Sequence, residues 1–339
     1  MEGKVLITGG AGYIGTHTLK QLLQENFSCV VLDDLSTGFL EPIQLLKTKY
    51  PFEFIKGNLQ EKDTLQKIFK NHQIDTVIHL AAKINVSESI LKPQLYHQEN
   101  YLGGVNLVEA MTEAGVQKLI FSSTAAVYGN PKYTPIDENH PTQPLTPYAQ
   151  TKLDFEKYLE RIKNLQYIIL RYFNVGGSDP EGILGKSHLK SEDLIENIMK
   201  VALSQKENLE IFGSDYNTSD GTTIRDLIHV EDVAQAHVLA FKKMAELSGQ
   251  IFNLGSESGT SLREIIDKAS IIIGKKIPTK MTERRPGDIA VSVASAKRAK
   301  KLLGWKPQYS NLEKIVQTDW NWRKTHPLGY NFDKFPRTW

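Results

Sequence analysis

The first half of the chain alternates short, almost continuously apolar runs with helical patterns, and this alternation limits the folds it can adopt. Strand-like runs occupy residues 4–8, 29–33, 52–57, 76–81, 118–123 and 167–174, with helical patterns at 13–25, 61–72, 98–115 and 148–163. Strands that are apolar on both faces are typical of a parallel sheet covered by helices. The sequence therefore predicts an α/β fold with a doubly wound parallel (Rossmann) sheet, whose ligands lie at the carboxyl ends of the strands.

The regular alternation of strand-like and helical patterns ends after Asn174. Residues 176–185 form a glycine-rich connection, and looser elements follow to about residue 330. We expect a first domain over residues 1–175 and a smaller C-terminal domain over 176–339 that mainly binds the substrate. Part of 225–255, which holds the apolar run IFNLG, is expected to return to the first domain.

Composition excludes several classes of protein. The formal charge of the 339 residues is only +2 and the basic residues are dispersed, so neither nucleic acid nor a membrane surface is an expected partner. Cys29 is the only cysteine, which rules out an intrachain disulfide and leaves no thiolate set for a metal. No apolar run is long enough to span a bilayer, and the strand pattern that starts at Lys4 leaves no room for a signal peptide. A cytoplasmic enzyme without a metal is expected.

A glycine-rich turn directly follows the first strand, in the stretch TGGAGYIG. Gly9, Gly12 and Gly15 allow a tight turn and a close approach of the backbone to a pyrophosphate, whose charge the following helix N-terminus favours. Asp33 ends the second strand, where its carboxylate can accept hydrogen bonds from an adenosine ribose. No arginine closely follows Asp33, so NAD is favoured over NADP. The alternative is a glycine turn with a structural role only.

A tyrosine and a lysine stand one helical turn apart in the stretch TPYAQTK. The chain carries the Tyr-x-x-x-Lys spacing three times, but only Tyr148 and Lys152 have helical context, with Thr146 as N-cap and Pro147 at the first helical position. The free phenol has a pKa of about 10, and a nearby ammonium and a positive nicotinamide ring would lower it. Tyr148 is therefore the predicted base, the alternative being a surface pair on an amphipathic helix.

Hydroxyl groups end the strand that precedes this helix. Ser122, Ser123 and Thr124 close the run KLIFSST, at the edge of the sheet where Tyr148 is expected. A hydroxyl there could pass a proton between the substrate and Tyr148, although such residues often bond only to the backbone. Together with the glycine turn and the Tyr/Lys pair, Thr124 indicates a catalytic site.

These motifs together resemble the extended short-chain dehydrogenase/reductase superfamily and, over nearly the whole chain, its UDP-glucose 4-epimerase family. The resemblance is carried by the stretches ITGGAGYIGTHT, VVLDDLSTG, FSSTAAVYG, TPYAQTK, LRYFNVGG, DGTTIRDLIHV, RRPGD and HPLGY. The later stretches belong to the substrate-binding half of the family and are more specific to it than the Rossmann motifs are. The resemblance also implies a homodimer formed by the helices around 98–115 and 148–163.

The resemblance implies a mechanism that these residue types can support. Tyr148 takes the proton from the sugar 4-hydroxyl while tightly held NAD removes the C4 hydride. The 4-keto sugar turns about its link to UDP and takes the hydride back on its other face, which interconverts UDP-glucose and UDP-galactose. Thr124 bonds the 4-oxygen and Lys152 the nicotinamide ribose.

The resemblance also implies the two binding sets. The cofactor set is Gly9, Gly12, Tyr13, Ile14, Gly15, Asp33, Asp34, Leu35, Ser36, Thr37, Gly38, Asn58, Leu59, Leu80, Ala81, Ala82, Lys83, Asn100 and Phe173, with Thr124, Tyr148 and Lys152. The UDP-sugar set is Asn174, Asp193, Leu194, Phe212, Arg225, Arg285, Asp288 and Ser292, again with Thr124 and Tyr148. Taken singly, Phe212 reads as a core residue and Arg225 as a surface ion pair with Asp226.

The chain departs from the family pattern at a few positions. Asn58 stands where an aspartate is common, and Thr124 where a serine is common. Ile84 follows Lys83 where some members place a lysine. Asp193 replaces an amide or histidine, and an acid beside a diphosphate is repulsive unless it points away. None of these changes removes a catalytic group.

Related reactions on the same scaffold are the main alternatives. A 4,6-dehydratase needs an Asp-Glu pair after the threonine, and Ala125 and Ala126 stand there instead. A decarboxylase or another nucleotide-sugar epimerase of the family remains open. A non-catalytic NAD-binding regulator also remains open, although Tyr148, Lys152 and Thr124 disfavour it.

Ser292 bears on the range of substrates. In the family this position borders the pocket for the sugar 2-substituent, and a tyrosine there excludes N-acetyl groups. A serine leaves room for an acetamido group, which predicts activity on UDP-GlcNAc and UDP-GalNAc as well. The alternative is an ordinary loop serine whose missing volume a neighbour fills.

Overall fold

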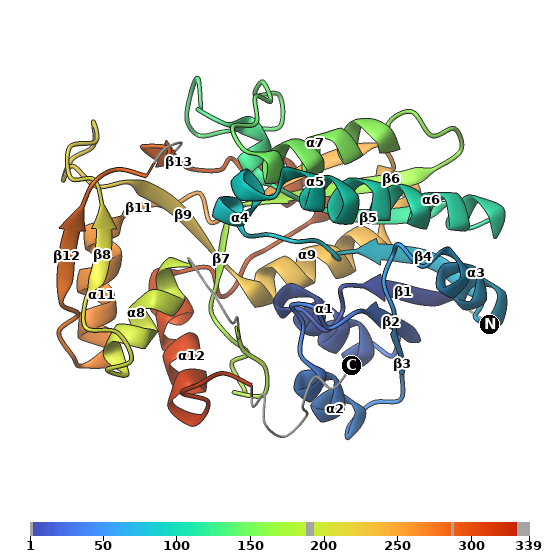
Figure 1. Ribbon diagram of the computed structural model, residues 1–339, viewed down its shortest axis with the longest axis horizontal. Coiled ribbons are helices and arrows are strands. Elements are labelled where there is room, and N and C mark those ends of the chain that lie inside the picture. The colour runs from blue at the N-terminus through green and yellow to red at the C-terminus, as the bar shows by residue number, and fades with distance from the viewer. Residues whose placement is uncertain (1–2, 188–192, 286–287, 331–339) are drawn as a thin grey trace.

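A seven-stranded parallel sheet forms the larger part of the protein. The computed structural model describes residues 3–187, 193–285 and 288–330 (Figure 1). The strand order is β10-β6-β5-β4-β1-β2-β3. The bounds are β1 Lys4–Thr8, β2 Cys29–Asp33, β3 Glu53–Lys56, β4 Ile74–His79, β5 Lys118–Thr124, β6 Gln166–Tyr172 and β10 Gln250–Leu254. The predicted doubly wound parallel sheet is confirmed, and its order reverses at β1, where a dinucleotide site is expected.

Helices cover both faces of the sheet because its strands are apolar on both sides. Leu6 and Val77 point to the face packed by α3 (Lys62–Asn71), α6 (Gly103–Glu113) and α7 (Pro147–Leu159). Val5 and Ile7 point to the opposite face, which α1 (Tyr13–Gln24), α2 (Leu40–Lys47) and α9 (Val230–Lys242) cover. The alternation of strand side chains between two cores is the period-two pattern of a buried strand.

Two predicted boundaries are wrong. The stretch 98–115 is not one α-helix, since a π-helical turn, η1 (His97–Leu102), precedes α6. The run 167–174 is not one strand. β6 ends at Tyr172, and β7 (Asn174–Gly176) pairs with β9 (Ile224–His229) in another sheet. The chain thus leaves the large sheet at Phe173.

The second half builds two small sheets and a helical layer. β9 lies between β11 (Gly259–Ser261) and β13 (Val291–Ser292), and β8 (Leu209–Phe212) pairs with β12 (Thr279–Thr282). The apolar sides of α8 (Leu194–Ala202), α11 (Leu262–Ile273) and α12 (Leu312–Thr325) form a separate core with them. The segment 250–254 then returns to the large sheet as β10, beside β6.

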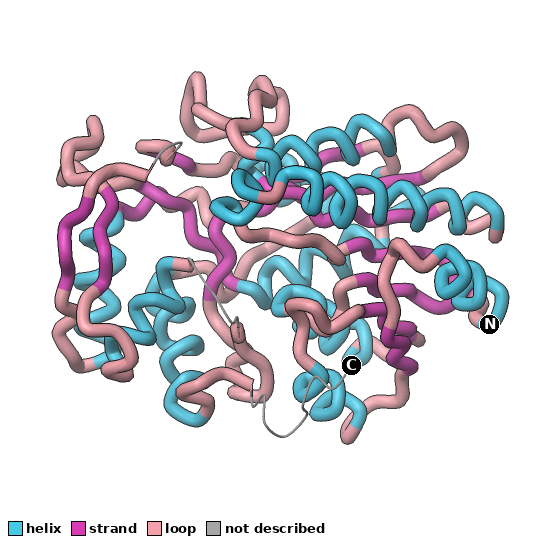
Figure 2. The backbone as a smooth tube through the Cα atoms, in the orientation of Figure 1, coloured by secondary structure: helices cyan, strands magenta, loops and turns pink. Residues whose placement is uncertain are grey.

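The carboxyl ends of the strands in the large parallel sheet face the small sheets (Figure 1), and Figure 2 shows the strands in magenta among the helices in cyan. Short elements fill the remaining connections: α4 (Val86–Leu91) and α5 (Pro93–Tyr96) follow β4, and η2 (Ala125–Tyr128) follows β5. The elements α10 (Met244–Leu247) and η3 (Ala299–Leu303) complete the described set. Among the described residues, no helix combines the length and the apolar character needed to cross a membrane.

Candidate active site

The glycine turn after β1 is packed too tightly for side chains. Gly9 has φ +72°, and a Cβ there would lie 2.5 Å from the backbone nitrogen of Ala81. A Cβ on Gly15 would lie 2.2 Å from the carbonyl oxygen of Gly9. Helix α1 begins directly after this turn, with no side-chain cap and no acidic residue in its first turn. Its N-terminal N–H groups and positive dipole end therefore suit a diphosphate.

Asp33 lies at the end of β2, next to the glycine turn. Its Oδ2 accepts from the Ala11 N–H at 2.9 Å and its Oδ1 from the Leu35 N–H at 2.8 Å. Leu35 has φ +59°, which is a costly backbone conformation for a leucine. This conformation accompanies the hydrogen bond that the Leu35 N–H donates to Asp33. Burial raises the pKa of Asp33 to about 6, against the two backbone hydrogen bonds that favour the carboxylate. Each oxygen keeps a lone pair for the hydroxyls of a ribose, so these residues fit a dinucleotide.

The departure at Asn58 has a structural reason. Its Nδ2 donates to Asp34 Oδ2 at 2.7 Å, and its Oδ1 accepts from the Gln60 N–H at 2.8 Å. Asp34 in turn accepts from the Ser36 N–H at 2.8 Å. A carboxylate at position 58 would repel Asp34, whereas the amide joins the two loops.

Asn100 fixes the loop after β4. Its Oδ1 accepts from the Lys83 N–H at 2.8 Å, and its Nδ2 donates to the Lys83 carbonyl at 2.9 Å. The π-helical turn η1 carries Asn100, and such turns occur often at functional sites. This clamp holds the segment 80–83 beside Gly9, so the structure brings together these predicted cofactor residues.

Thr124 and Tyr148 meet at the carboxyl edge of the sheet. Thr124 ends β5, and Tyr148 lies in the first turn of α7, which Thr146 caps by accepting from the Ala149 N–H at 3.3 Å. Burial raises the pKa of Tyr148 to about 12, and its hydrogen bond with Thr124 offsets only part of this effect. The expected lowering of the phenol pKa is therefore not provided by the protein groups alone.

Lys152 is buried below this pair. Its Nζ donates to the carbonyl oxygen of Ser122 at 2.9 Å and lies 4.8 Å from the centre of the Phe121 ring. Burial lowers the pKa of Lys152 to about 7, and the carboxylate of Glu156 opposes that shift. The backbone carbonyl of Ser122 holds the lysine, while its hydroxyl bonds His237 Nε2 at 2.9 Å.

A second group of predicted residues gathers around β9. Arg225 Nη2 pairs with Asp288 Oδ1 at 2.7 Å, and its Nη1 donates to the Ile289 carbonyl at 2.6 Å. The Arg285 guanidinium lies 3.6 Å from the centre of the Phe212 ring. Ser292 is the register partner of Arg225 across β13 and β9.

The alternative of a surface pair between Arg225 and Asp226 is wrong. Asp226 is buried and accepts from Ser256 and from the Ala294 N–H at 3.0 Å, while Arg225 turns to Asp288. The residues Pro286 and Gly287 of the RRPGD stretch lie outside the described part of the chain.

Asp193 faces a basic partner that no sequence motif indicated. Its Oδ2 pairs with Lys186 Nζ at 2.8 Å, and its Oδ1 caps α8 by accepting from the Glu196 N–H at 3.1 Å. The same ammonium lies 5.1 Å from the centre of the Tyr13 ring, at the start of α1. The charge of Asp193 is therefore compensated by Lys186. Asn174, another predicted substrate residue, is exposed at the start of β7.

The glycine turn, the buried Tyr/Lys pair and the Rossmann sheet agree with the comparisons to known proteins. Residues 5–255 match the family described as the NAD dependent epimerase/dehydratase family, and the chain belongs to this family. Within it, the chain is similar to curated UDP-glucose 4-epimerases. That of Halalkalibacterium halodurans is 43% identical over 332 residues, which are 96% of this chain and 97% of the relative.

Solved structures support the same placement. The UDP-glucose 4-epimerase of Bifidobacterium longum, in complex with NAD+ and UDP, has a TM-score of 0.92 at 34% identity, covering 96% of this chain and 100% of that one. The UDP-Glc/GlcNAc 4-epimerase of Campylobacter jejuni has a TM-score of 0.84 at 37% identity, covering 96% and 100%. The chain is thus an NAD-dependent enzyme that epimerises UDP-glucose and UDP-galactose at C4.

Proposed function

We propose that Tyr148 is the acid/base of the C4 epimerisation, with Thr124 as its hydrogen-bonding partner at the sugar 4-oxygen. The observation that carries this proposal is the position of the two residues, with Thr124 at the carboxyl end of β5 and Tyr148 in the first turn of α7, one turn before the buried Lys152. A phenol within reach of the 4-hydroxyl can take its proton when the sugar is oxidised and return it when the sugar is reduced.

NAD supplies the hydride acceptor, and its positive ring favours the Tyr148 phenolate. The residues that would hold it are those of the glycine turn, Asp33 at the adenosine ribose, and Lys152 at the nicotinamide ribose. Lys152 is suited to this role because its ammonium is already fixed by the Ser122 carbonyl. Of the remaining predicted cofactor residues, Tyr13 and Ile14 lie at the start of α1 and Asn100 lies in η1. Most of the others follow the carboxyl ends of β2, β3, β4 and β6.

The UDP part of the substrate is assigned to the group around β9. Arg225 and Arg285 provide charge-assisted bonds to a diphosphate, and Asp288 can accept from ribose hydroxyls. Phe212 lies partly exposed below the Arg285 guanidinium, where a uracil could pack. Asn174 and the first residue of α8, Leu194, complete the set, while Asp193 is turned to Lys186.

The range of substrates is proposed to include UDP-GlcNAc and UDP-GalNAc. Ser292 is small and only partly buried in β13, opposite Arg225. The similar Campylobacter jejuni enzyme is named for activity on both the Glc and GlcNAc sugars. A pocket that admits an acetamido group follows from this small side chain.

The assembly, location and domain division are also proposals. We infer a cytoplasmic homodimer that uses the adjacent helices η1, α6 and α7. Tyr101 and Tyr158 form a T-shaped pair there at 6.2 Å between ring centroids, and both remain partly exposed. Residues 1–175 would form the NAD-binding domain and 176–339 mainly the substrate domain, with β10 returning to the first.

One experiment tests the function directly. The purified protein is incubated with UDP-galactose and the mixture is analysed for UDP-glucose, with Tyr148→Phe in parallel. Conversion by the wild-type protein alone supports the proposal. A decarboxylase would instead release carbon dioxide from a UDP-uronate, and a regulator would bind NAD without converting any sugar.

A further inference from the structure

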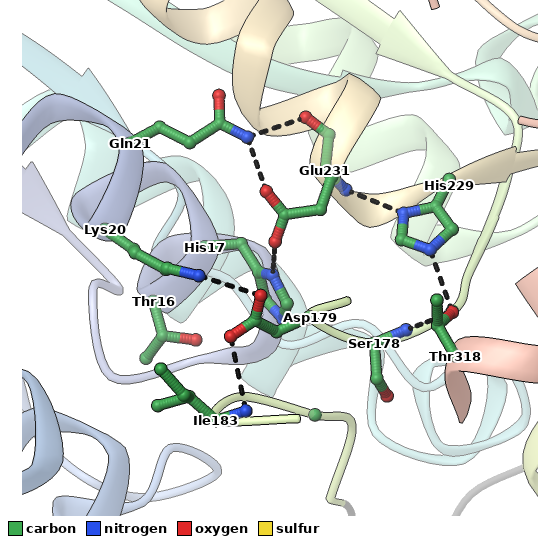
Figure 3. A network of polar contacts seen from close by, with 12 residues as sticks. Thr16, His17, Lys20, Gln21, Ser178, Asp179, Ile183, His229, Glu231 and Thr318 are labelled. Atoms are coloured by element: carbon green, nitrogen blue, oxygen red, sulfur yellow. Dashed lines mark hydrogen bonds and ion pairs between the residues drawn. The ribbon is translucent and has the colours of Figure 1, made fainter. Parts of the chain in front are cut away.

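A ring of buried polar contacts joins the cofactor helix α1 to the elements that carry the proposed substrate residues (Figure 3). Its members are His17, Lys20, Gln21, Ser178, Asp179, His229, Glu231 and Thr318. We call this set the polar ring. We propose that the polar ring is a positioning device, which fixes the dinucleotide site relative to the UDP-sugar site during the reaction.

The first side of the polar ring is one stripe of α1. Positions 13, 17, 20 and 21 fall on the same face of a helix, because they follow i, i+4, i+7, i+8 spacing. Tyr13 donates to the Gly177 carbonyl. His17 Nδ1 bonds Glu231 Oε1 at 2.6 Å, and Lys20 Nζ donates to Asp179 Oδ1 at 2.8 Å. The glycine turn immediately precedes this stripe, so its contacts act directly on the start of the cofactor helix.

The second side is made by the end of β9, the start of α9 and one residue of α12. Glu231 accepts from Gln21 Nε2 at 2.6 Å, and its own N–H donates to His229 Nδ1 at 3.1 Å. The proton of the neutral His229 ring must then be on Nε2, which bonds Thr318 Oγ1 at 2.9 Å. Burial lowers the pKa of His229 to about 3, which agrees with a neutral ring.

The polar ring closes through α12 and the glycine-rich connection. Thr318 Oγ1 accepts from the Ser178 N–H at 3.1 Å, and the next residue, Asp179, returns to Lys20. Asp179 also accepts from the Ile183 N–H at 3.2 Å and so shapes the connection itself. Gly177 has φ +84°, and a Cβ there would lie 2.5 Å from the His229 ring, so this approach requires glycine.

The strands that end in the polar ring are those that carry proposed UDP-sugar ligands. β9 bears Arg225 and ends at His229, while β7 bears Asn174 and leads directly into Gly177. The polar ring thus sets the distance between the cofactor helix and both strands. This inference rests on the proposed placement of the UDP-sugar at β7 and β9.

The chemistry of the polar ring favours positioning over simple stability. Its charged and imidazole members His17, Lys20, Asp179, His229 and Glu231 are all buried. Buried ion pairs are often no more stabilising than apolar side chains of the same size, but their bonds demand a defined geometry. Epimerisation needs this geometry twice, because C4 must meet the same cofactor with each of its two faces.

Lys20→Met and Thr318→Val test the inference in the NAD-loaded enzyme. Thr318→Val preserves side-chain shape and leaves no buried charge, so it decides the question if Lys20→Met does not fold. Lys20→Arg keeps the positive charge and should therefore retain the epimerase activity of the wild-type protein. Lys62→Met is the matched control, since Lys62 pairs with Glu109 at 3.0 Å on the exposed surface between α3 and α6.

We expect kcat for UDP-galactose to fall by about tenfold or more in both test variants, with little change in KM, because small misplacements of reacting groups slow the chemical step. We also expect the near-ultraviolet absorbance of reduced cofactor to grow during turnover. A keto sugar that escapes before its return leaves oxidised, and the cofactor that accepted its electrons stays reduced. Lys20→Arg and Lys62→Met should match the wild-type protein in both readouts.

A lowered melting temperature with wild-type kcat and no reduced cofactor would overturn the inference, because the polar ring would then only stabilise the fold. The proposed function is judged separately, from the conversion of UDP-galactose by the wild-type protein and its loss in Tyr148→Phe. If that conversion is absent, NAD retention after gel filtration tests the polar ring instead. We then expect Lys20→Met and Thr318→Val to retain less NAD than Lys62→Met, because the polar ring holds the start of the cofactor helix. Retention that is equal in Lys20→Met, Thr318→Val and Lys62→Met would overturn it.

Discussion

The Nζ atom of Lys152 donates a 2.9 Å hydrogen bond to the carbonyl oxygen of Ser122, two residues before Thr124 on β5. The lysine is therefore positioned by the strand that also supplies the threonine. A single strand end thus orients two of the three proposed catalytic groups. Burial lowers the pKa of Lys152 to about 7, so keeping this side chain charged in the folded protein costs free energy.

This lowered pKa predicts how stability depends on pH. The pKa of a lysine in an unfolded chain is about 10.4. Between pH 7 and that value the unfolded chain holds a proton that folded Lys152 has lost, so the free energy of unfolding should rise with pH. The cost is full below pH 7 and disappears as the pH approaches the unfolded value. The slope is at most about 1.4 kcal/mol per pH unit.

Urea denaturation of the cofactor-free protein at about pH 7 and pH 9 measures this effect. Lys152→Met should lack the part of the pH dependence that comes from this group, and Lys157→Met, which changes an exposed lysine of the same helix, should keep it. An unchanged difference between the two pH values in Lys152→Met would contradict the assignment.

Tyr148→Phe should lower the rate of epimerisation by at least about 10², the scale of general acid–base catalysis. The phenyl ring preserves packing and removes only the transferable proton. Conversion of UDP-galactose under saturating conditions gives kcat, and NAD content after gel filtration shows that the site is still formed. Near-normal kcat in the phenylalanine variant would remove Tyr148 from its proposed role.

Asp33 predicts a pH dependence of NAD binding. The pKa of its carboxyl group is raised to about 6 by burial, yet only the ionised form can accept all the bonds offered by the backbone and a ribose. Binding should therefore release a proton below that value. Affinity should rise by up to about tenfold per unit as the pH increases towards 6, and then level off.

Calorimetric titration of the cofactor-free protein with NAD at several pH values checks this. Asp33→Asn should bind more weakly and without this pH dependence, while Asp63→Asn on the exposed face of α3 should behave as the wild-type protein. A flat profile for the wild-type protein would show that Asp33 is already ionised before NAD binds.

The fold was predictable where one local pattern decides it. β1 and β2 are apolar on both faces, so their sequences alone indicated buried parallel strands. Helix α2 escaped prediction because Pro42 lies in its first turn, where proline is tolerated although it breaks the periodic pattern. The π-helical turn η1 was also missed, since apolar spacing does not distinguish it from an α-helix.

The site was predictable to the extent that its residues are close in sequence. Gly9, Asp33 and the Tyr148/Lys152 pair carry local signals of their chemistry. The ion pair between Arg225 and Asp288 joins residues far apart in the chain, and only the family resemblance indicated their common role. The raised pKa of Tyr148 was not foreseen, because burial depends on the packed fold and not on the neighbouring residues.

Ser292 should decide which sugars enter the site. Its position opposite Arg225 across β13 and β9 places a small side chain beside the proposed UDP-sugar ligands. We expect the wild-type protein to interconvert UDP-GlcNAc and UDP-GalNAc as well as UDP-glucose and UDP-galactose. Ser292→Tyr should selectively remove the activity on the acetylated pair, since overpacking typically costs about 1–3 kcal/mol, or roughly tenfold to a hundredfold in rate.

Ser292→Ala is the matched control, because it removes the hydroxyl but keeps the space for an acetamido group. The ratio of kcat/KM for UDP-GalNAc to that for UDP-galactose should be similar in the wild-type protein and Ser292→Ala, and should fall in Ser292→Tyr. A wild-type protein that converts UDP-galactose rapidly but leaves UDP-GlcNAc untouched would refute the pocket argument. A neighbouring side chain would then fill the volume that the serine leaves, and the enzyme would be a strict hexose epimerase.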